Sequence, residues 1–460
     1  MNDRPRMISL SEWDDRYKEL SDAGLKEPAY GGPLSRHVDD GDLRLRALRF
    51  DNSAAALRLW NFLLTEEDRL SAARASGKKL VGTMKDLGTV PVIAYSSPEL
   101  VAFYPDGAWW IPCVMELGAG LLGIADSLGI DESFCPVRAM LGAFATEAHF
   151  PIPDLLICSV GATCDDFSAI AQRLASLGHS IAWWEAPARR KPDPGEESIT
   201  LPGGFRAAVD QVDFMKSELQ RLRRIIEKEA GSKIDDSALC AGIKAANGVR
   251  RILAELRLTV FRAAAAPLPA LEMLIAEMLA IHFCSDRTES ALVLQGLLDE
   301  ACARQAAGVG VLPVDAVRVF WVNPVADLRV MNLLEKCGGR ICGSEFLFSH
   351  ALDEIPEDLP PMDALARMAL ADPMIGGAED RADRVCADIE LFGAEALLIS
   401  RIPGASHCAT EGQVIGDRVR SRLGIPVQEI EVPPVSDSLL PTLSTRIEAL
   451  VETVLQRRKK

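Results

Sequence analysis

Two cysteines follow apolar runs and precede helical patterns, which is where a thiolate is chemically favoured. Cys164 comes shortly after the apolar residues 153–160, and Cys408 comes in the same way after residues 396–400. The partial positive charge at a helix N-terminus lowers the pKa of a thiol, and a thiolate is both a nucleophile and a metal ligand. These two positions are therefore candidates for redox or metal chemistry.

A third cysteine, Cys135, stands between two helical patterns and is followed by Pro136, a residue suited to the first position of a helix. A cysteine at such a junction is nevertheless more often a small buried residue than a ligand. The chain has eleven cysteines but no C-x-x-C motif that would favour a cluster. From the residues alone, packing and metal ligation both stay open for all three.

The elements that must position these cysteines form two series of alternating strands and helices. In the first series, residues 167–177 are helical, and we expect strands at 92–95, 153–160 and 180–184. In the second series we expect strands at 316–322, 339–343, 396–400 and 427–432 and helices at 326–336, 379–392, 413–423 and 443–457. Such alternation is typical of parallel sheets covered by helices, so the fold class is α/β with two flavodoxin/Rossmann-like parallel-sheet domains.

The remaining segments have helical patterns without strand-like alternation. We expect an N-terminal helical segment at 1–80, a first α/β domain at 81–204 with Cys135 and Cys164, a helical insertion at 205–310, and a second α/β domain at 311–460 with Cys408. Long helices are expected at 205–230, 237–256 and 268–281. Parallel sheets bind ligands beyond the carboxyl ends of their strands, which is where Cys164 and Cys408 stand.

Composition excludes several classes of partner. The 460 residues are 48% hydrophobic and carry a formal net charge of −16, which disfavours binding to nucleic acid or to anionic lipid. No apolar stretch reaches the length of a membrane span, and the first residues lack the pattern of an export signal, so we expect a cytoplasmic protein. The sequence has no Walker A loop and no dinucleotide-binding glycine motif. If the reaction uses ATP, we therefore expect a separate protein to bind it.

Further segments resemble a known family. Pro153 and Asp154 begin an apolar strand that leads to Cys164, and Cys135 precedes a Leu-Gly step. The helical segment 234–269 resembles the family's helical insert, and the C-terminal segments 424–431 and 445–449 follow the family pattern most closely. In order, and from about residue 81 to residue 452, the chain resembles the subunits of 2-hydroxyacyl-CoA dehydratases and ATP-dependent benzoyl-CoA reductases.

The resemblance implies a cofactor and partners. Such subunits hold a [4Fe–4S] cluster with three cysteines and leave one iron open, which implies Cys135, Cys164 and Cys408 as ligands here. It also implies a homologous second subunit, an ATP-hydrolysing iron–sulfur activator and an acyl-CoA substrate. The implied reaction dehydrates a 2-hydroxyacyl-CoA or reduces an aromatic acyl-CoA after one electron is added to the thioester carbonyl.

Three polar residues are candidates for contact with that substrate. Ser97 and Glu99 follow the expected strand at 92–95, where the family's first domain faces the substrate, so they could contact the thioester or move a proton. The alternative for this pair is a helix N-cap with an acidic first turn. His407, beside Cys408, could donate a hydrogen bond or a proton to the acyl group, or have a structural role.

Two other functions fit the same pattern. Some relatives carry a double-cubane [8Fe–9S] cluster and reduce small molecules, which requires more thiolate ligands. The chain could also be a non-catalytic electron-transfer partner that keeps a cluster without an open iron. The iron content and the response of the cluster to acyl-CoA distinguish these alternatives.

Overall fold

Two parallel four-stranded sheets form the framework of the computed structural model, which describes residues 4–22, 32–39, 43–84, 88–107, 120–279, 284–347, 352–434 and 437–460. The strands of the first sheet are β3 (Lys79–Met84), β4 (Leu100–Phe103), β5 (Leu155–Gly161) and β6 (Ile181–Ala186). Those of the second sheet are β9 (Val317–Val322), β10 (Gly339–Glu345), β11 (Ala396–Arg401) and β12 (Val427–Glu431). The expectation of two parallel-sheet α/β domains is confirmed.

The two sheets have the same topology. Their strand orders are β4-β3-β5-β6 and β10-β9-β11-β12, so in both the first strand of the chain pairs with the second and the third. This is the flavodoxin-like order, in which the direction of winding reverses between the first and third strands. Ligands of such sheets bind at that reversal, beyond the carboxyl ends of the strands.

Helices cover both faces of each sheet. One face of the first sheet packs against α7 (Gly120–Ser127), α8 (Ala139–Thr146) and α9 (Asp165–Ser176), and the other packs against α10 (Val209–Ala230). The second sheet is associated with α14 (Arg329–Lys336), α16 (Ala378–Phe392), α18 (Gly412–Leu423) and α19 (Leu440–Arg458). Burial on both faces explains why these strands are almost continuously apolar. One helix crosses between the halves, because α15 (Pro361–Leu370) packs against α10.

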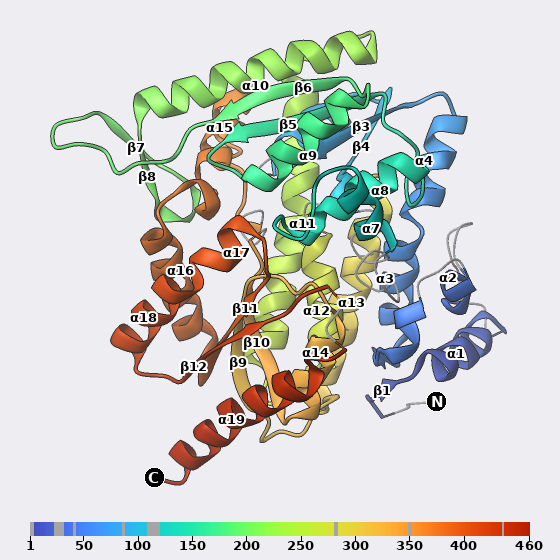
Figure 1. The fold of residues 1–460 in the computed structure, drawn as a ribbon, viewed down its shortest axis with the longest axis vertical. Helices are drawn as coiled ribbons and strands as arrows, with labels where there is room; N and C mark the ends of the chain where they lie inside the picture. The colour runs from blue at the N-terminus through green and yellow to red at the C-terminus, as the bar shows by residue number, and fades with distance from the viewer. Residues whose placement is uncertain are drawn as a thin grey trace.

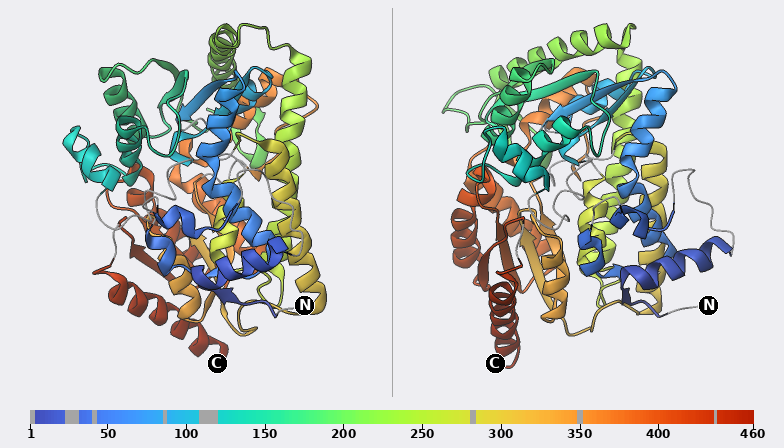
Figure 2. Two further views of the ribbon diagram at one scale, coloured as in Figure 1. Left: turned by 90° about the vertical axis from the view of Figure 1, so that its right-hand side faces the viewer. Right: turned by 45° about the vertical axis from the view of Figure 1, so that its right-hand side comes forward.

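The middle of the chain is helical, as expected, with α11 (Asp236–Arg262), α12 (Ala270–Met278) and α13 (Arg287–Ala307). Figures 1 and 2 show α11 and α13 running between the level of the first sheet and that of the second. The N-terminal elements are β1 (Met7–Ile8), α1 (Leu10–Asp22), α2 (Ser35–Asp39), β2 (Phe50–Asp51), α3 (Ala54–Leu64) and α4 (Glu66–Ala75). They pack beside these helices through Trp13, Phe50 and Trp60, whose rings stack or meet edge to face.

One expected strand is wrong. Residues 92–95 belong to α5 (Val90–Tyr95), and the true neighbouring strands are β3 and β4, which the sequence pattern did not separate. Branched apolar residues favour a strand locally, but Pro91 suits the first turn of a helix, and tertiary burial of residues 90–94 overrides the local preference.

Two boundaries also differ from the expectation. Strands β7 (Ser198–Thr200) and β8 (Arg206–Ala208) form an antiparallel hairpin, so α10 begins at Val209 instead of residue 205. A short helix, α17 (Ser406–Thr410), lies in the segment expected as a loop before α18. In the described ranges, no helix has both the length and the apolar character needed to cross a membrane.

Candidate cysteine site between the two sheets

Cys164 and Cys408 occupy corresponding places in the two domains. Cys164 is the N-cap residue of α9 and follows β5, and Cys408 lies in α17, which follows β11. Both β5 and β11 are the third strands of their sheets, so both cysteines lie where the winding reverses. In Figure 1, α17 lies at the level between the two sheets.

Cys135 joins these two positions. It is the N-cap residue of the 3₁₀ helix Pro136–Arg138, with the proline at the first position as expected. Its half-buried side chain packs against the core of the first domain and also against the small cluster that contains Cys408. Burial raises the pKa of the Cys135 thiol, and the negative charges of Cys164 and Cys408 raise it further. The structure therefore brings the three cysteines together.

Direct contacts hold the two domains together at this place. The Cys164 Sγ atom lies 3.8 Å from the Ser406 Oγ atom of α17. Asp166, at the start of α9, accepts hydrogen bonds from the backbone N–H of Cys135 at 3.0 Å and from the backbone N–H of Ser406 at 3.2 Å. The loop before α17 also touches the segment before Cys135, because Gly404 lies against the backbone there.

A buried polar network lies behind Cys408. Asn323, just after β9, donates from its side-chain amide to the backbone oxygens of Ser400 at 2.8 Å and of Cys408 at 3.4 Å. Its φ of 69° is in the left-handed region, which Asn adopts more readily than most residues. Arg381 donates to the Asn323 Oδ1 atom at 2.5 Å and also pairs with Glu345. The backbone of Cys408 is thus anchored to the second domain.

The three thiols are unfavourable as free thiolates. Burial raises the pKa of Cys164 to about 11, and the Asp166 carboxylate adds to this effect. Burial also raises the pKa of Cys408 to about 12, although the nearby Arg381 opposes the rise. A bound cation would reverse this balance, because metal binding is coupled to thiol deprotonation.

The donor set fits an iron–sulfur cluster. Thiolate sulfur is the ligand type that such clusters use, and three thiols converge from three segments. In the ranges that the structure describes, no three His, Cys, Asp or Glu side chains are arranged to hold one metal ion. A polynuclear cluster is held by ligands that lie further apart than those of a single ion.

His407 lies at the edge of this site with both ring nitrogens near polar atoms. Its Nε2 atom is 3.1 Å from the backbone oxygen of Met374, which makes Nε2–H the donor, and its Nδ1 atom is 3.4 Å from the Ser406 Oγ atom. These contacts favour a structural role, because the proton on Nε2 is already hydrogen-bonded to Met374 and is not directed at a substrate.

Ser97 and Glu99 lie elsewhere. The backbone oxygen of Glu99 accepts from the N–H of Lys79, the first residue of β3, so this segment is at the amino edge of the first sheet. Ser97 is buried there and Glu99 is exposed. The expected strand at 92–95, which would have placed Ser97 and Glu99 near the substrate, is part of helix α5. Cys164 lies at the opposite, carboxyl edge of the first sheet.

Sequence reasoning gave no role to Asp166, Ser406, Asn323 or Arg381. Asp166 alone had a local signal, because it is an acidic residue two positions after a candidate cysteine at a helix N-terminus. The others interact with residues distant in the sequence and leave no local pattern.

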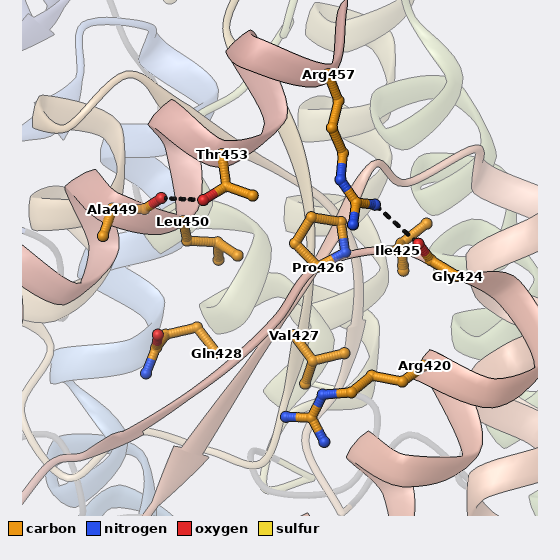
Figure 3. A pocket seen from close by; sticks show the side chains of 10 residues that line it. All are labelled: Arg420, Gly424, Ile425, Pro426, Val427, Gln428, Ala449, Leu450, Thr453 and Arg457. Atoms are coloured by element: carbon orange, nitrogen blue, oxygen red, sulfur yellow. Dashed lines mark hydrogen bonds between the residues drawn. The ribbon is translucent and has the colours of Figure 1, made fainter.

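Two cavities lie near the sheets. The larger, of about 480 Å³, is open and is lined by residues from α18, α19 and the start of β12, among them Arg420 and Arg457 (Figure 3). Since β12 starts at Val427, this hollow is at the amino edge of the second sheet, away from Cys408. Arg457 is bonded to the backbone oxygen of Gly424 across it.

The smaller cavity, of about 30 Å³, is at the carboxyl edge of the first sheet, because Gly88 and Tyr104 follow β3 and β4. It is lined further by Arg287 and Ser290 at the start of α13. The Ser290 Oγ atom and the Arg287 Nε atom have no hydrogen-bond partner within the described part of the chain. This cavity therefore has polar groups to offer to a ligand.

Comparisons with known proteins agree with this architecture. The family model described as 2-hydroxyglutaryl-CoA dehydratase, D-component, matches residues 105–454, a segment that includes both sheets' third strands and all three cysteines. No curated protein matches the chain. Because the match covers well over half of its length, the chain belongs to the 2-hydroxyglutaryl-CoA dehydratase D-component family.

Proposed function

We propose that this chain is the [4Fe–4S] subunit of a radical enzyme that acts on CoA thioesters, and that Cys135, Cys164 and Cys408 are the cluster ligands. The observation that carries the proposal is the convergence of these three cysteines, from two domains, at the winding reversals of both sheets. Family membership supports a dehydratase component. We therefore propose dehydration of a 2-hydroxyacyl-CoA as the reaction, with reduction of an aromatic acyl-CoA ring as the alternative.

When bound, the cluster would supply one electron at low potential and an iron that can act as a Lewis acid toward the substrate oxygen. The residues of the chain do the rest. The three thiols would hold the cofactor, and the loop that carries Ser406 contacts both Cys164 and the segment at Phe134 beside it. Arg381 and Asn323 fix the Cys408 backbone.

The small cavity at the carboxyl edge of the first sheet, of about 30 Å³, has room for about one or two water molecules and is too small for an acyl group. An acceptor oxygen there would satisfy the Ser290 hydroxyl and the Arg287 Nε–H, which otherwise lose hydrogen bonds on burial. The guanidinium of Arg287 is held over the Tyr95 ring, 3.5 Å from its centroid, and so keeps a defined position.

Partners complete the proposal. Because the sequence has no phosphate-binding loop of its own, ATP would be hydrolysed by a separate iron–sulfur activator that delivers the electron. A homologous second subunit would pair with this chain, as expected of a component named for one part of an enzyme.

The test is the iron and acid-labile sulfide content of protein purified or reconstituted without oxygen. We expect about four irons per chain in the wild type, and loss of most iron in Cys135→Ala, Cys164→Ala and Cys408→Ala. Cys158→Ala is the matched control, because Cys158 is buried in β5 six positions before Cys164 and should leave the iron content unchanged. An iron-free wild type would contradict the proposal.

The same preparation separates the alternatives. About eight irons per chain would favour the double-cubane reductase. Four irons per chain, with a cluster spectrum that does not change when acyl-CoA is added, would favour an electron-transfer partner. Turnover of a 2-hydroxyacyl-CoA that requires ATP, a reductant, the activator and the second subunit would establish the dehydratase.

A further inference from the structure

We infer that Asp166 is a positioning residue. It holds the segments that carry Cys135, Cys164 and Cys408 in place relative to one another, and it puts a negative charge beside the cluster. The inference rests on the proposed function, because it concerns the same site. Asp166 is only 5% exposed and lies in the first turn of α9, two residues after Cys164. Neither family membership nor the proposed ligand set assigns it a role.

The contacts of its two carboxylate oxygens divide between the domains. Oδ1 accepts the backbone N–H of Cys135 at 3.0 Å. Oδ2 accepts the backbone N–H of Ser406 at 3.2 Å and its hydroxyl at 3.3 Å, and lies 3.7 Å from the Cys164 Sγ atom. One buried side chain therefore contacts a cysteine, the backbone of a second cysteine, and the residue two positions before the third.

A carboxylate is the side chain that this geometry requires. The backbone N–H groups of Cys135 and Ser406 are both donors and face different oxygens of the carboxylate, so both oxygens must accept. An asparagine of the same shape has only one acceptor atom, and its NH₂ group would face an N–H donor on one side. Asp166→Asn must therefore lose contact with either Cys135 or Ser406, which belong to different domains.

The charge of Asp166 has a second consequence. None of the ion pairs recorded among the described residues involves Asp166, and its contacts are neutral amides, a hydroxyl and a thiol. A negative charge beside a cluster ligand stabilises the oxidised cluster, and so makes the reduction potential more negative.

The first measurement uses the apoprotein and needs no cluster. Hydrogen–deuterium exchange of peptides that contain Cys135 and Ser406 is compared for the wild type, Asp166→Asn and Asp165→Asn. Asp165 is the matched control, because it is exposed in the same first turn of α9. We expect roughly tenfold faster exchange at one or both amides in Asp166→Asn, as loss of a charge-assisted hydrogen bond implies, and wild-type exchange in Asp165→Asn.

The second measurement uses the reconstituted protein. We expect Asp166→Asn to retain less iron per chain than Asp165→Asn, and its remaining cluster to have a more positive midpoint potential. A residue with a merely structural role would lower occupancy without moving the potential. Wild-type exchange at both amides, or wild-type iron content with an unchanged potential, would overturn the role of Asp166.

The outcomes for Asp166 and for the proposed function are distinguishable. An iron-free wild type would overturn the proposed function and with it the role toward the cluster. A four-iron wild type with an unaltered Asp166→Asn variant would overturn the role of Asp166 alone. If Asp166→Asn does not fold, Ser406→Ala replaces it, since it removes the hydroxyl contacts with Asp166, Cys164 and His407 and keeps the backbone N–H that Asp166 accepts. Faster hydrogen–deuterium exchange around residue 406, together with a lower iron content, would then support the positioning role of Asp166. Wild-type values for both would refute it.

Discussion

Gly404 lies directly against the backbone of Phe134, so the loop that leads to Cys408 touches the segment that leads to Cys135. A Cβ atom at Gly404 would be 2.5 Å from the Phe134 carbonyl oxygen and 3.0 Å from that of Glu132. Its φ of 78° is also in the region that favours glycine. The close approach of the two domains at the cysteine site thus depends on the missing side chain.

The first prediction follows from this contact. Gly404→Ala should separate the two loops and lower both the free energy of unfolding and the iron content per chain. Gly424→Ala is the matched control, because Gly424 has a φ of 66° but no atom within 4 Å of an added Cβ. Both variants carry the backbone strain of about 1 kcal/mol, so an iron loss that is equal in the two would contradict the prediction.

Arg381 provides the second prediction. It is 1% exposed and is bonded to Asn323, Glu345 and Glu411. Arg381→Met leaves two carboxylates near Cys408 without their cation, which should cost about 3–5 kcal/mol in the free energy of unfolding. Denaturant unfolding measures this.

The comparison for Arg381 is Arg418→Met, which breaks the exposed pair between Arg418 and Asp383. An exposed pair contributes about 0.2–1 kcal/mol, so this variant should be near the wild type. A loss of less than 1 kcal/mol in Arg381→Met would show that the network is not needed for stability.

The third prediction concerns the small cavity. Ser290→Ala removes a buried hydroxyl that has no partner within the described ranges, so the apoprotein should be as stable as the wild type or slightly more stable. Because the cavity of about 30 Å³ holds only about one or two water molecules, the KM for acyl-CoA should stay at the wild-type value. Ser217→Ala, exposed on α10, is the control. A fall of about 1 kcal/mol or more in the free energy of unfolding of Ser290→Ala would contradict the prediction, because it would mean that the hydroxyl has a partner.

The fourth prediction is a pH dependence of stability. Burial raises the pKa of Glu272 to about 8, with the nearby Asp51 carboxylate adding to the rise. Between the ordinary pKa of 4.5 and 8, the folded protein keeps a proton that the unfolded chain has lost. The free energy of unfolding should therefore decrease as pH rises through this window, by up to about 1.4 kcal/mol per pH unit for this group.

Glu272→Gln tests that dependence, since it resembles the protonated acid. Its amide oxygen can still accept from the Asp51 N–H and the Trp60 Nε1–H, as Glu272 does now. The free energy of unfolding, measured at several pH values from 5 to 9, should depend less on pH in this variant than in the wild type. In Glu255→Gln, which changes an exposed residue, it should depend on pH as in the wild type. Parallel curves for all three proteins would contradict the pKa rise.

Much of the architecture was predictable because its signals are local. Strands β5, β9 and β11 are buried on both faces, so each is an apolar run whose limits lie within a few residues of the expected ones. The family resemblance, carried by short segments around the cysteines and near the C-terminus, is confirmed by the match over residues 105–454. The assignment of the cysteines as ligands stays a prediction.

Local signals failed where packing outweighed them. Residues 90–95 have the composition of a strand, but they form α5, because β3 and β4 already occupy the sheet and the segment must cross between them. The expected site role of Ser97 and Glu99 depended on that strand, and the structure places both residues at the amino edge.

The sequence by itself determined where each cysteine stands relative to its own strand or helix, since that depends on the few residues on either side. Only the tertiary structure decided that Cys135, Cys164 and Cys408 meet, because their meeting requires two separately folded sheets to place their carboxyl edges together. The bond between Asp166 and Ser406 joins residues 240 positions apart. A contact over that separation is set by how the domains pack, and no local pattern of residues records it.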